Sequence, residues 1–472
     1  MEQESTLYRQ IARQLLQDIY KETYAYGTRL PSLQALCERF SAGRNTVRAA
    51  LALLEADGVV HREKGSCARV RLDIHQLESN PHFLYRMACS KQGIAHAYDA
   101  LGMLMPVAIQ EALKQSDATQ LEELQQGVRQ LTQQEHTLYE LNEALQQLYL
   151  KVLGFLHNPY LQDLVKQLLD FLYLPYAHHA HSEEVLADNK VKLSDTLARI
   201  LLFVVQNNPF MMKKTIRYFC DITKKNSNRY LNRVCAGITA QRVIEFEWYT
   251  GREVSYLYMQ TAGYLLQDIA ENCYPNGQLL NLEQLAKRYA VSLRTMRRTM
   301  KFMNDLNLVE TVNGLGSRSV YSCKQTAAYL QDAQVQALLE YYSCSLELLE
   351  LVAKASLASC MERCPAKELY AIGEAVCTQQ SLSPKLVLHI LKHHENPCIC
   401  NIVEQIEAAT SGSMLIRTLL QHSPDALTQT ALASWKQQLK NKEIKKAVQL
   451  TLELLQEECS YWKQLRDENR SD

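Results

Sequence analysis

The chain has 472 residues, and its 51 Lys and Arg residues balance 51 Asp and Glu residues. A net charge of zero excludes a polyanion-binding protein that is basic over its whole surface, but it leaves local basic patches open. Hydrophobic residues make up 47% of the chain, which is enough for packed cores, so extended disorder is not expected. With only 16 Gly and 11 Pro residues, the chain is poor in turn-forming residues, which disfavours an all-β sandwich and a glycine-lined cofactor fold and predicts a mainly α fold.

Three features bear on where the protein works. No apolar run reaches the roughly 18 residues that a membrane span needs, so no membrane segment is expected. The first residues, Met1-Glu2-Gln3-Glu4-Ser5, lack a basic region followed by an apolar stretch, so no secretory signal is expected either. The 14 Cys residues are scattered along the chain, which favours free thiols over a disulfide framework. Together these features predict a cytoplasmic protein.

Three short helices and a hairpin are predicted at the start of the chain. Apolar residues spaced by four define one face of the first helix: Leu7, Ile11, Leu15 and Ile19. A second helix is expected to start at residues 30–32, with Pro31 near its first turn. A third helix runs through residues 47–54 and is closed by Gly58. Residues 59–62 and 67–70 can pair as two strands around a turn. This order predicts a winged helix-turn-helix, whose third helix fits the major groove of DNA.

The segment resembles the DNA-binding domain of GntR-family bacterial transcription regulators. The resemblance rests on five motifs within residues 5–72: Leu7-Tyr8-x-Gln10-Ile11, Gly27-x-x-Leu30-Pro31-Ser32, Arg44-Asn45-Thr46-Val47-Arg48-x-Ala50-Leu51, Leu54-Glu55-x-Asp57-Gly58 and Lys64-Gly65-Ser66. It implies that the recognition helix and the wing tip contact DNA. The residues that would make these contacts are Arg44, Asn45, Thr46, Arg48, Lys64 and Gly65.

The sequence departs from the family pattern in two places. Leu33 and Gln34 stand where the family often has Glu-Arg, so a DNA contact from that arginine is not expected. Gly43 replaces the usual Ser before the recognition helix and is a weaker N-cap. Residues 1–72 still carry eleven basic and eight acidic side chains, and a net charge of +3 attracts phosphates. The alternative is a winged helix used only for protein contact.

The same pattern returns about 250 residues later. Matching segments are Leu257-Tyr258-x-Gln260 for Leu7-Tyr8-x-Gln10, 265–269 for 15–19, Gly277 for Gly27, and Thr295-Met296-Arg297 for Thr46-Val47-Arg48. Residues 257–324 also carry a net charge of +3, from eight basic and five acidic side chains.

This second copy has a different recognition helix. Ser292 is a better N-cap than Gly43, but Leu293 stands in the place of Arg44. The back of the helix is a predicted core stripe of Met296, Met300 and Met303. Its front is basic, and DNA contact is predicted for Arg294, Thr295, Arg297 and Arg298. The alternative is a vestigial head used in packing.

The remaining segments read as two all-helical bundles. The predicted domains are thus a head at 1–74, a bundle at 75–253, a second head at 254–325 and a second bundle at 326–472. This order resembles the GntR branch with a helical effector domain, and Asn158-Pro159 is echoed by Asn396-Pro397. That domain often binds a metal, but Leu145, Tyr149 and Val387 stand where ligands would fall. No metal or cofactor is therefore predicted, and an organic effector, or none, is expected.

Three clusters of metal-ligating or redox residue types have simpler interpretations. His178, His179 and His181 are expected to be solvated loop residues. His393-His394 with Cys398-x-Cys400 lacks the paired spacing of structural zinc. Cys360 and Cys364 lie one helical turn apart and read as ordinary helix residues rather than a redox pair. No nucleophile and base stand together in a catalytic pattern, so the chain is not expected to be an enzyme.

The sequence thus predicts a cytoplasmic, sequence-specific regulator of transcription that binds double-stranded DNA through winged helix-turn-helix heads alternating with helical bundles. The bundles can hold a small-molecule effector. Two heads on one chain predict an intrachain pseudo-dimer or a homodimer that joins through its bundles. The competing hypothesis is a protein-interaction and assembly module whose winged helices have lost DNA binding.

Overall fold

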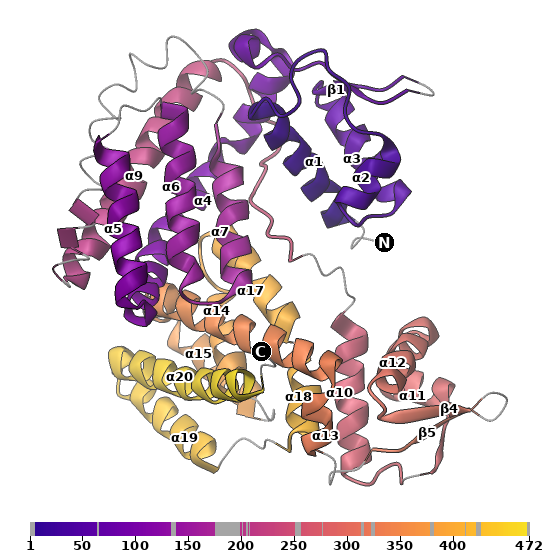
Figure 1. The fold of residues 1–472 in the computed structure, drawn as a ribbon. Coiled ribbons are helices and arrows are strands. Elements are labelled where there is room, and N and C mark those ends of the chain that lie inside the picture. Colours follow the sequence, from indigo (N-terminus) through magenta and orange to yellow (C-terminus); the bar gives the residue numbers. More distant parts are fainter. Residues whose placement is uncertain are drawn as a thin grey trace. The chain divides into compact units, whose positions relative to one another are not determined.

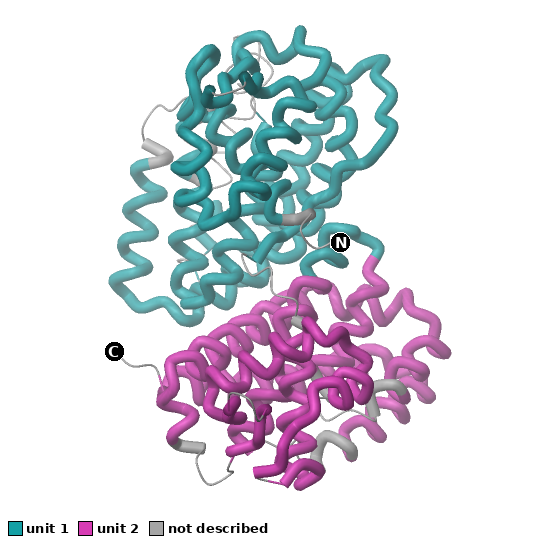
Figure 2. Tube along the Cα trace, turned by 90° about the vertical axis from the view of Figure 1, so that its right-hand side faces the viewer, with its two compact units in different colours: residues 1–253, 395–402 teal, residues 254–394, 403–472 magenta. Residues whose placement is uncertain are grey.

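The computed structural model describes residues 5–63, 66–133, 138–174, 199–200, 202–203, 206, 208–250, 256–275, 277–312, 316–321, 326–377, 382–410, 412–421 and 426–469. The chain divides into two compact units (Figure 2). Unit 1 comprises residues 1–253 and 395–402, and unit 2 comprises residues 254–394 and 403–472. The fold is mainly α-helical, as the composition predicts, and the strands of the described residues are confined to two short regions.

Unit 1 begins with three helices and a short hairpin (Figure 1). These are α1 (Ser5–Tyr20), α2 (Leu33–Arg39), α3 (Arg44–Ala56), β1 (Val60–His61) and β2 (Arg69–Val70). Three predicted core residues of α1, Ile11, Leu15 and Ile19, are buried, and α1 packs on α3. Val47 and Leu54 of α3 are fully buried. Each such side chain stabilises the fold by about 1.5–3 kcal/mol, which fixes the face that α3 turns inward.

Two predicted boundaries in this head are shifted. Helix α2 begins at Leu33, because the Ser32 hydroxyl accepts the Ala35 N–H at 3.2 Å and makes Ser32 the N-cap. Pro31 therefore lies before the helix rather than in its first turn. The strands are shorter than predicted, with Val60 opposite Val70 and His61 opposite Arg69.

The shorter ladder has a physical cause at each end. The Arg62 N–H donates to the Glu55 carboxylate at 2.8 Å, which removes Arg62 from the ladder. In the second strand, residues 68–70 form hydrogen bonds with the segment before α2. The Leu30 N–H donates to the Ala68 carbonyl at 2.8 Å, and the Val70 N–H donates to the Thr28 carbonyl at 2.9 Å.

The rest of unit 1 is helical. Its described elements are η1 (Ile74–Ser79), α4 (Pro81–Gln115), α5 (Ala118–Gln133), α6 (Leu138–Gly154), α7 (Pro159–Leu172) and α9 (Pro209–Val234). The long helix α4 packs against α9, α7 and α6. Three of these helices start at an Asn-Pro pair, where the Asn side chain accepts backbone N–H groups and Pro occupies the first turn: Asn80, Asn158 and Asn208.

Unit 2 also begins with helices and a small sheet. These elements are α10 (Tyr256–Ala270), β3 (Leu279–Leu280), α11 (Leu282–Arg288), α12 (Leu293–Asp305), β4 (Val309–Val312) and β5 (Gly316–Ser319). The sheet has the order β3-β5-β4, and all of its pairs are antiparallel. The β3 strand extends the predicted hairpin by a third strand, because Leu279 and Leu280 pair with Arg318 and Ser317.

The helices that follow form the rest of unit 2. They are α13 (Thr326–Gln331), α14 (Ala333–Arg363), α15 (Ala366–Cys377), α16 (Leu382–Leu391), α17 (Pro397–Thr410), α18 (Ser413–Leu419), α19 (Ala426–Lys440) and α20 (Ile444–Glu468). Helix α14 packs along α20, which is buried at Ala447, Thr451 and Leu455. Helix α18 packs on α10, where a Cβ at Gly263 would lie 2.9 Å from the Leu415 nitrogen.

The first turns of α17 belong to unit 1. The Asn396 side-chain amide donates to the His96 carbonyl at 2.9 Å, and the Asn401 side-chain oxygen accepts the Trp248 N–H at 2.7 Å. These bonds satisfy the backbone of residues 96 and 248, which explains why eight residues of the later chain are part of unit 1.

Candidate nucleic-acid interface

The outer face of α3 carries most of the predicted contact residues of the first head. Arg44, Asn45 and Arg48 are exposed, whereas Thr46 is half-buried. Arg44 and Arg48 lie one turn apart on the same face of the helix. Within the described part of the chain, neither guanidinium has a hydrogen bond or an ion pair. The exposed side of α3 therefore presents two cations that are unengaged among the described residues.

Lys64 and Gly65, the residues predicted at the wing tip, lie outside the described residues. The base of the wing is held to α3. The Arg62 guanidinium donates to the Glu55 carboxylate at 2.7 Å, and the Arg62 N–H donates to the same carboxylate. These two donors lower the pKa of Glu55. Sequence reasoning missed this contact, although the acid at the end of the helix and the Arg after the strand could have suggested it.

Helix α12 presents a second basic face. The predicted stripe of Met296, Met300 and Met303 is buried, which confirms that these residues belong to the core. Arg294, Arg297, Arg298 and Lys301 are exposed, and Thr295 is half-buried. Among these cations Arg298 lies over the Tyr258 ring at 4.4 Å from the centroid. Arg294 and Arg297 have no hydrogen bond or ion pair among the described residues.

The backbone turns at matching positions in the first head and in the first part of unit 2. Four residues with positive φ in the first head have counterparts in unit 2: Glu22 and Asn272, Gly27 and Gly277, Ser41 and Ala290, Gly58 and Asn307. The first two pairs are 250 residues apart (22 to 272, 27 to 277), and the last two are 249 apart (41 to 290, 58 to 307). One residue is thus missing from the second copy between residues 277 and 290, where Leu280-Asn281 replaces Leu30-Pro31-Ser32.

A structural ion pair repeats with the same spacing. Arg39 contacts Asp18 at 2.8 Å in the first head, and Arg288 contacts Asp268 at 2.8 Å in unit 2. Each pair ties the helix before the recognition helix to the first helix of its head. Neither ion pair contains a predicted site residue. Both pairs join helices and so stabilise the fold.

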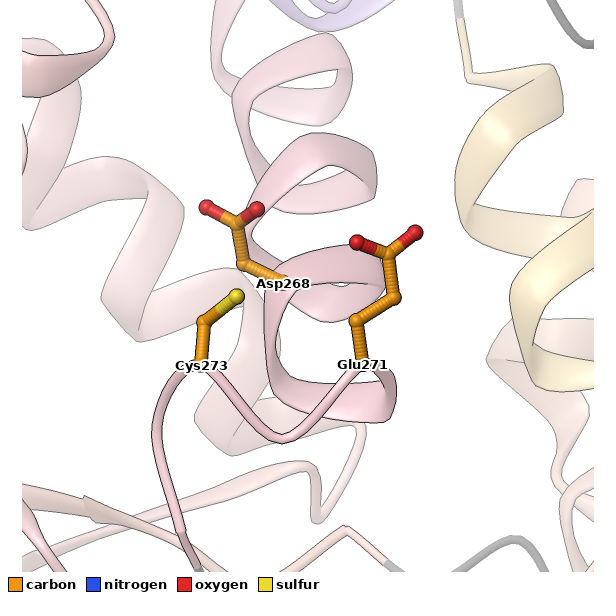
Figure 3. Close-up of side chains that lie close together, drawn as sticks. All are labelled: Asp268, Glu271 and Cys273. Atoms are coloured by element: carbon orange, nitrogen blue, oxygen red, sulfur yellow. The ribbon is translucent and has the colours of Figure 1, made fainter.

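Asp268 also belongs to a small cluster with Glu271 and Cys273 (Figure 3), whose ligand atoms lie within 4.8 Å of one another. Asp268 is engaged by Arg288 and by the Tyr289 hydroxyl, while Glu271 accepts the Gln267 side-chain amide at 2.8 Å. The equivalent positions in the first head are Asp18, Lys21 and Thr23, which are not a metal-ligand set. We therefore regard the cluster as an extension of the repeated ion pair.

Among the described residues, no other group of three metal-ligating side chains comes together. His178, His179 and His181 lie outside the described residues. Cys398 is fully buried, and burial raises the pKa of its thiol far above the ordinary value. Burial and a hydrogen bond to Glu368 raise the pKa of Cys364, which disfavours the reactive thiolate.

The first head thus has the architecture of a winged helix-turn-helix DNA-binding domain. Residues 7–70 match the family model of bacterial regulatory proteins, gntR family. No curated protein matches the chain. The DNA-binding domain of that family is therefore present over residues 7–70.

Three solved structures are similar to parts of the chain. A Listeria monocytogenes structure, titled "Lar controls the expression of the Listeria monocytogenes agr system and mediates virulence", is 18% identical, with 48% of this chain and 98% of that chain covered and a TM-score of 0.26. The Streptococcus agalactiae GntR structure is 15% identical, with 46% and 99% covered and a TM-score of 0.22. E. coli McbR/YncC is 18% identical, with 48% and 98% covered and a TM-score of 0.26.

None of the described helices has both the length and the apolar character needed to cross a membrane.

Proposed function

We propose that this protein is a sequence-specific regulator of transcription that reads double-stranded DNA with α3. The observation that carries the proposal is the pair of unengaged guanidinium groups, Arg44 and Arg48, on the outer face of a helix whose inner face is fixed by the core. Arginines on such a helix can donate bidentate hydrogen bonds to guanine in the major groove. Asn45 and Thr46 would complete the contact, and Lys64 and Gly65 would place the wing on the backbone.

We extend the proposal to the second head, which would be a winged helix-turn-helix as well. The matching φ pattern and the repeated Arg–Asp pair support it, and so do the exposed Arg294, Arg297 and Arg298 on α12. The heads would not read the same bases, because Leu293 replaces Arg44. The helical parts of the two units would position the heads and allow an effector to act on them.

The test is DNA selection with the full chain, followed by affinity measurements over a range of salt concentrations. A DNA reader loses affinity linearly in log salt, with a slope of about −0.9 for each neutralised phosphate on duplex DNA. An assembly module with inactive heads would show no such slope, and that result would favour the competing function.

Replacing Arg48 by Ala tests the site itself. If Arg48 contacts a base, Arg48→Ala weakens binding to the selected site by about 1–3 kcal/mol and leaves nonspecific binding nearly unchanged. The matched control is Lys440→Ala, an exposed cation on α19 in unit 2. Equal affinities and equal base preferences for the wild type and Arg48→Ala would remove Arg48 from the interface.

A further inference from the structure

Unit 1 encloses a cavity of about 360 Å³ between the first head and the helices behind it. The head contributes α1 and the end of α3, and the opposite wall comes from α4, α7 and residues 242–247. The last of these segments is fixed on α4, since the Ile244 N–H donates to the Cys89 carbonyl at 2.9 Å and a Cβ at Gly93 would collide with the Ile244 carbonyl. The volume falls within the range of small-molecule sites, which is about 300–1,000 Å³.

The acidic side chains that line this cavity are already paired. Arg9 contacts Glu247 at 3.0 Å, and Arg86 contacts Asp57 at 3.1 Å, so two ion pairs join the walls across the cavity. The Glu245 carboxylate lies 3.0 Å from the ring of His96. The basic side chains are therefore in excess, because two further arginines, Arg13 and Arg242, line the same space.

Neither of these two arginines has a carboxylate hydrogen-bond partner within the described residues. Arg13 donates to the Glu247 backbone carbonyl at 3.0 Å, and its guanidinium lies 5.5 Å from the centroid of the Phe171 ring. Arg242 is exposed at the rim. Burial, together with repulsion from Arg86 and Arg9, lowers the pKa of Arg13 to about 10, although Glu247 and Asp170 oppose this change. An anion beside Arg13 would relieve both effects.

A polar acceptor in the same wall is also unused. Gln17 is 7% exposed, and its amide nitrogen donates to the Asp170 carbonyl at 2.5 Å. Its side-chain oxygen has no hydrogen-bond partner. A buried acceptor without a donor costs about 1–3 kcal/mol. This oxygen has almost no accessible surface, so it is not a contact for a ligand in the cavity. Gln17 stands four residues after Arg13, so the two side chains share one face of α1.

We propose that this cavity binds a small organic acid, with its carboxylate on Arg13 and Arg242 and its apolar body against Phe171 and Ile94. The ligand would touch the head and the opposite wall at once and thereby change how firmly the head is held. This regulatory consequence rests on the proposed function, whereas binding itself does not.

The test measures the binding of 4-hydroxybenzoate, which combines a carboxylate, a ring and a hydroxyl donor, by saturation-transfer NMR and calorimetry on the full chain. We expect binding in the millimolar range or tighter, about −4 kcal/mol or better. The neutral analogue 4-hydroxybenzamide should bind at least about tenfold more weakly, because it lacks the charge that Arg13 attracts. No binding at roughly 10 mM, or equal binding of both compounds, would overturn the proposal.

Three variants locate the site. Arg13→Met keeps the apolar stem and removes the charge, and it should weaken binding at least about tenfold. Arg242→Met changes an exposed rim residue, so it tests the site even if Arg13→Met fails to fold, and it should weaken binding about threefold. Arg217→Met on α9, an exposed arginine outside the cavity, should have no effect. Unchanged binding in both cavity variants would place the ligand elsewhere and overturn the proposal.

The experiment separates this inference from the proposed function. Arg48 does not line the cavity, so Arg48→Ala should bind 4-hydroxybenzoate like the wild type. A chain that binds the acid but no DNA contradicts only the proposed function. A chain that binds DNA but not the acid contradicts only the cavity proposal.

Discussion

Gly43 and Ser292 show what one side chain contributes at the starts of α3 and α12. Both are N-caps with nearly the same backbone, φ −67° and ψ 153° at Gly43 and φ −69° and ψ 153° at Ser292. The Ser292 hydroxyl accepts the Thr295 N–H at 3.1 Å, whereas Gly43 has no side chain to offer. The first turn of α3 therefore lacks a hydrogen bond that α12 has.

Gly43→Ser should supply that bond to the Thr46 N–H. A Cβ at Gly43 would meet only the Thr46 hydroxyl oxygen, at 3.9 Å, so the replacement fits without strain. The gain over Gly is expected to be a few tenths of a kcal/mol, up to about 1 kcal/mol. Hydrogen exchange at the Thr46 amide should slow accordingly, and Gly43→Ala is the control that lacks the hydroxyl. Equal protection in the Ser and Ala variants would contradict the prediction.

At the scale of elements, a hydrogen bond at the end of α3 holds the base of the wing. Glu55 accepts the Arg62 N–H, and in unit 2 the Asn304 side-chain oxygen accepts the Thr311 N–H at 3.0 Å. A neutral amide oxygen therefore suffices to hold a wing. We expect Glu55→Ala to detach the wing and weaken DNA binding severalfold, while Glu55→Gln retains most of the affinity. Equal losses in both variants, measured by titration on selected DNA, would show that the charge matters and not the acceptor.

The contact between Glu55 and Arg62 also depends on pH, and the direction of that dependence follows from the pKa of Glu55. The pKa of Glu55 is lowered below its ordinary value of 4.5 by the two Arg62 donors. A lowered pKa contributes stability that is present above the pKa of the unfolded chain and is lost as the pH falls through the folded value. The Arg62 amide resonance should therefore stay unchanged between pH 5 and 8 and titrate only below about 4.5. A midpoint above that value would refute the contact.

The sequence predicts the helices better than the contacts between distant elements. The spacing of Ile11, Leu15 and Ile19 places them on one face, because a helix repeats locally every 3.6 residues. The predicted strand ends were wrong because two groups outside the hairpin bind ladder N–H groups: the Glu55 carboxylate binds that of Arg62, and the distant Thr28 carbonyl binds that of Val70. The cavity was not predicted at all, since it brings Arg13 together with Arg86 and Arg242. No local sequence pattern predicts that residues so far apart in the chain line one cavity.

The exposed residues on α3 and α12 were partly predictable. Helical periodicity places Arg48 and Arg297 about 100° around the helix from the buried Val47 and Met296, off the buried face. That periodicity shows which side chains are free to bind, but not what they bind. Residues 7–70 match a DNA-binding family, but the assignment of individual side chains as DNA contacts stays a prediction for α3 as well as for α12.

At the scale of the whole molecule, the proposed function gives the chain two recognition helices, α3 and α12, with different base-reading side chains. Two identical heads related by a two-fold axis match a palindrome, because the half-sites must share the symmetry of the protein. Helices α3 and α12 are not equivalent, since Arg44 has Leu293 as its counterpart. If both heads bind, one chain should therefore prefer two different half-sites.

Footprinting of single-head variants tests this arrangement. Arg48→Ala should erase protection over one half-site and Arg297→Ala over the other, while Lys440→Ala leaves both intact. Each loss should cost about 1–3 kcal/mol at its own half-site, because the other head keeps the chain near the DNA. A perfect palindrome that loses both halves with Arg48→Ala, and neither with Arg297→Ala, would mean that two chains bind through α3 alone. In that case α12 would serve packing, and its basic face would have no role in DNA recognition.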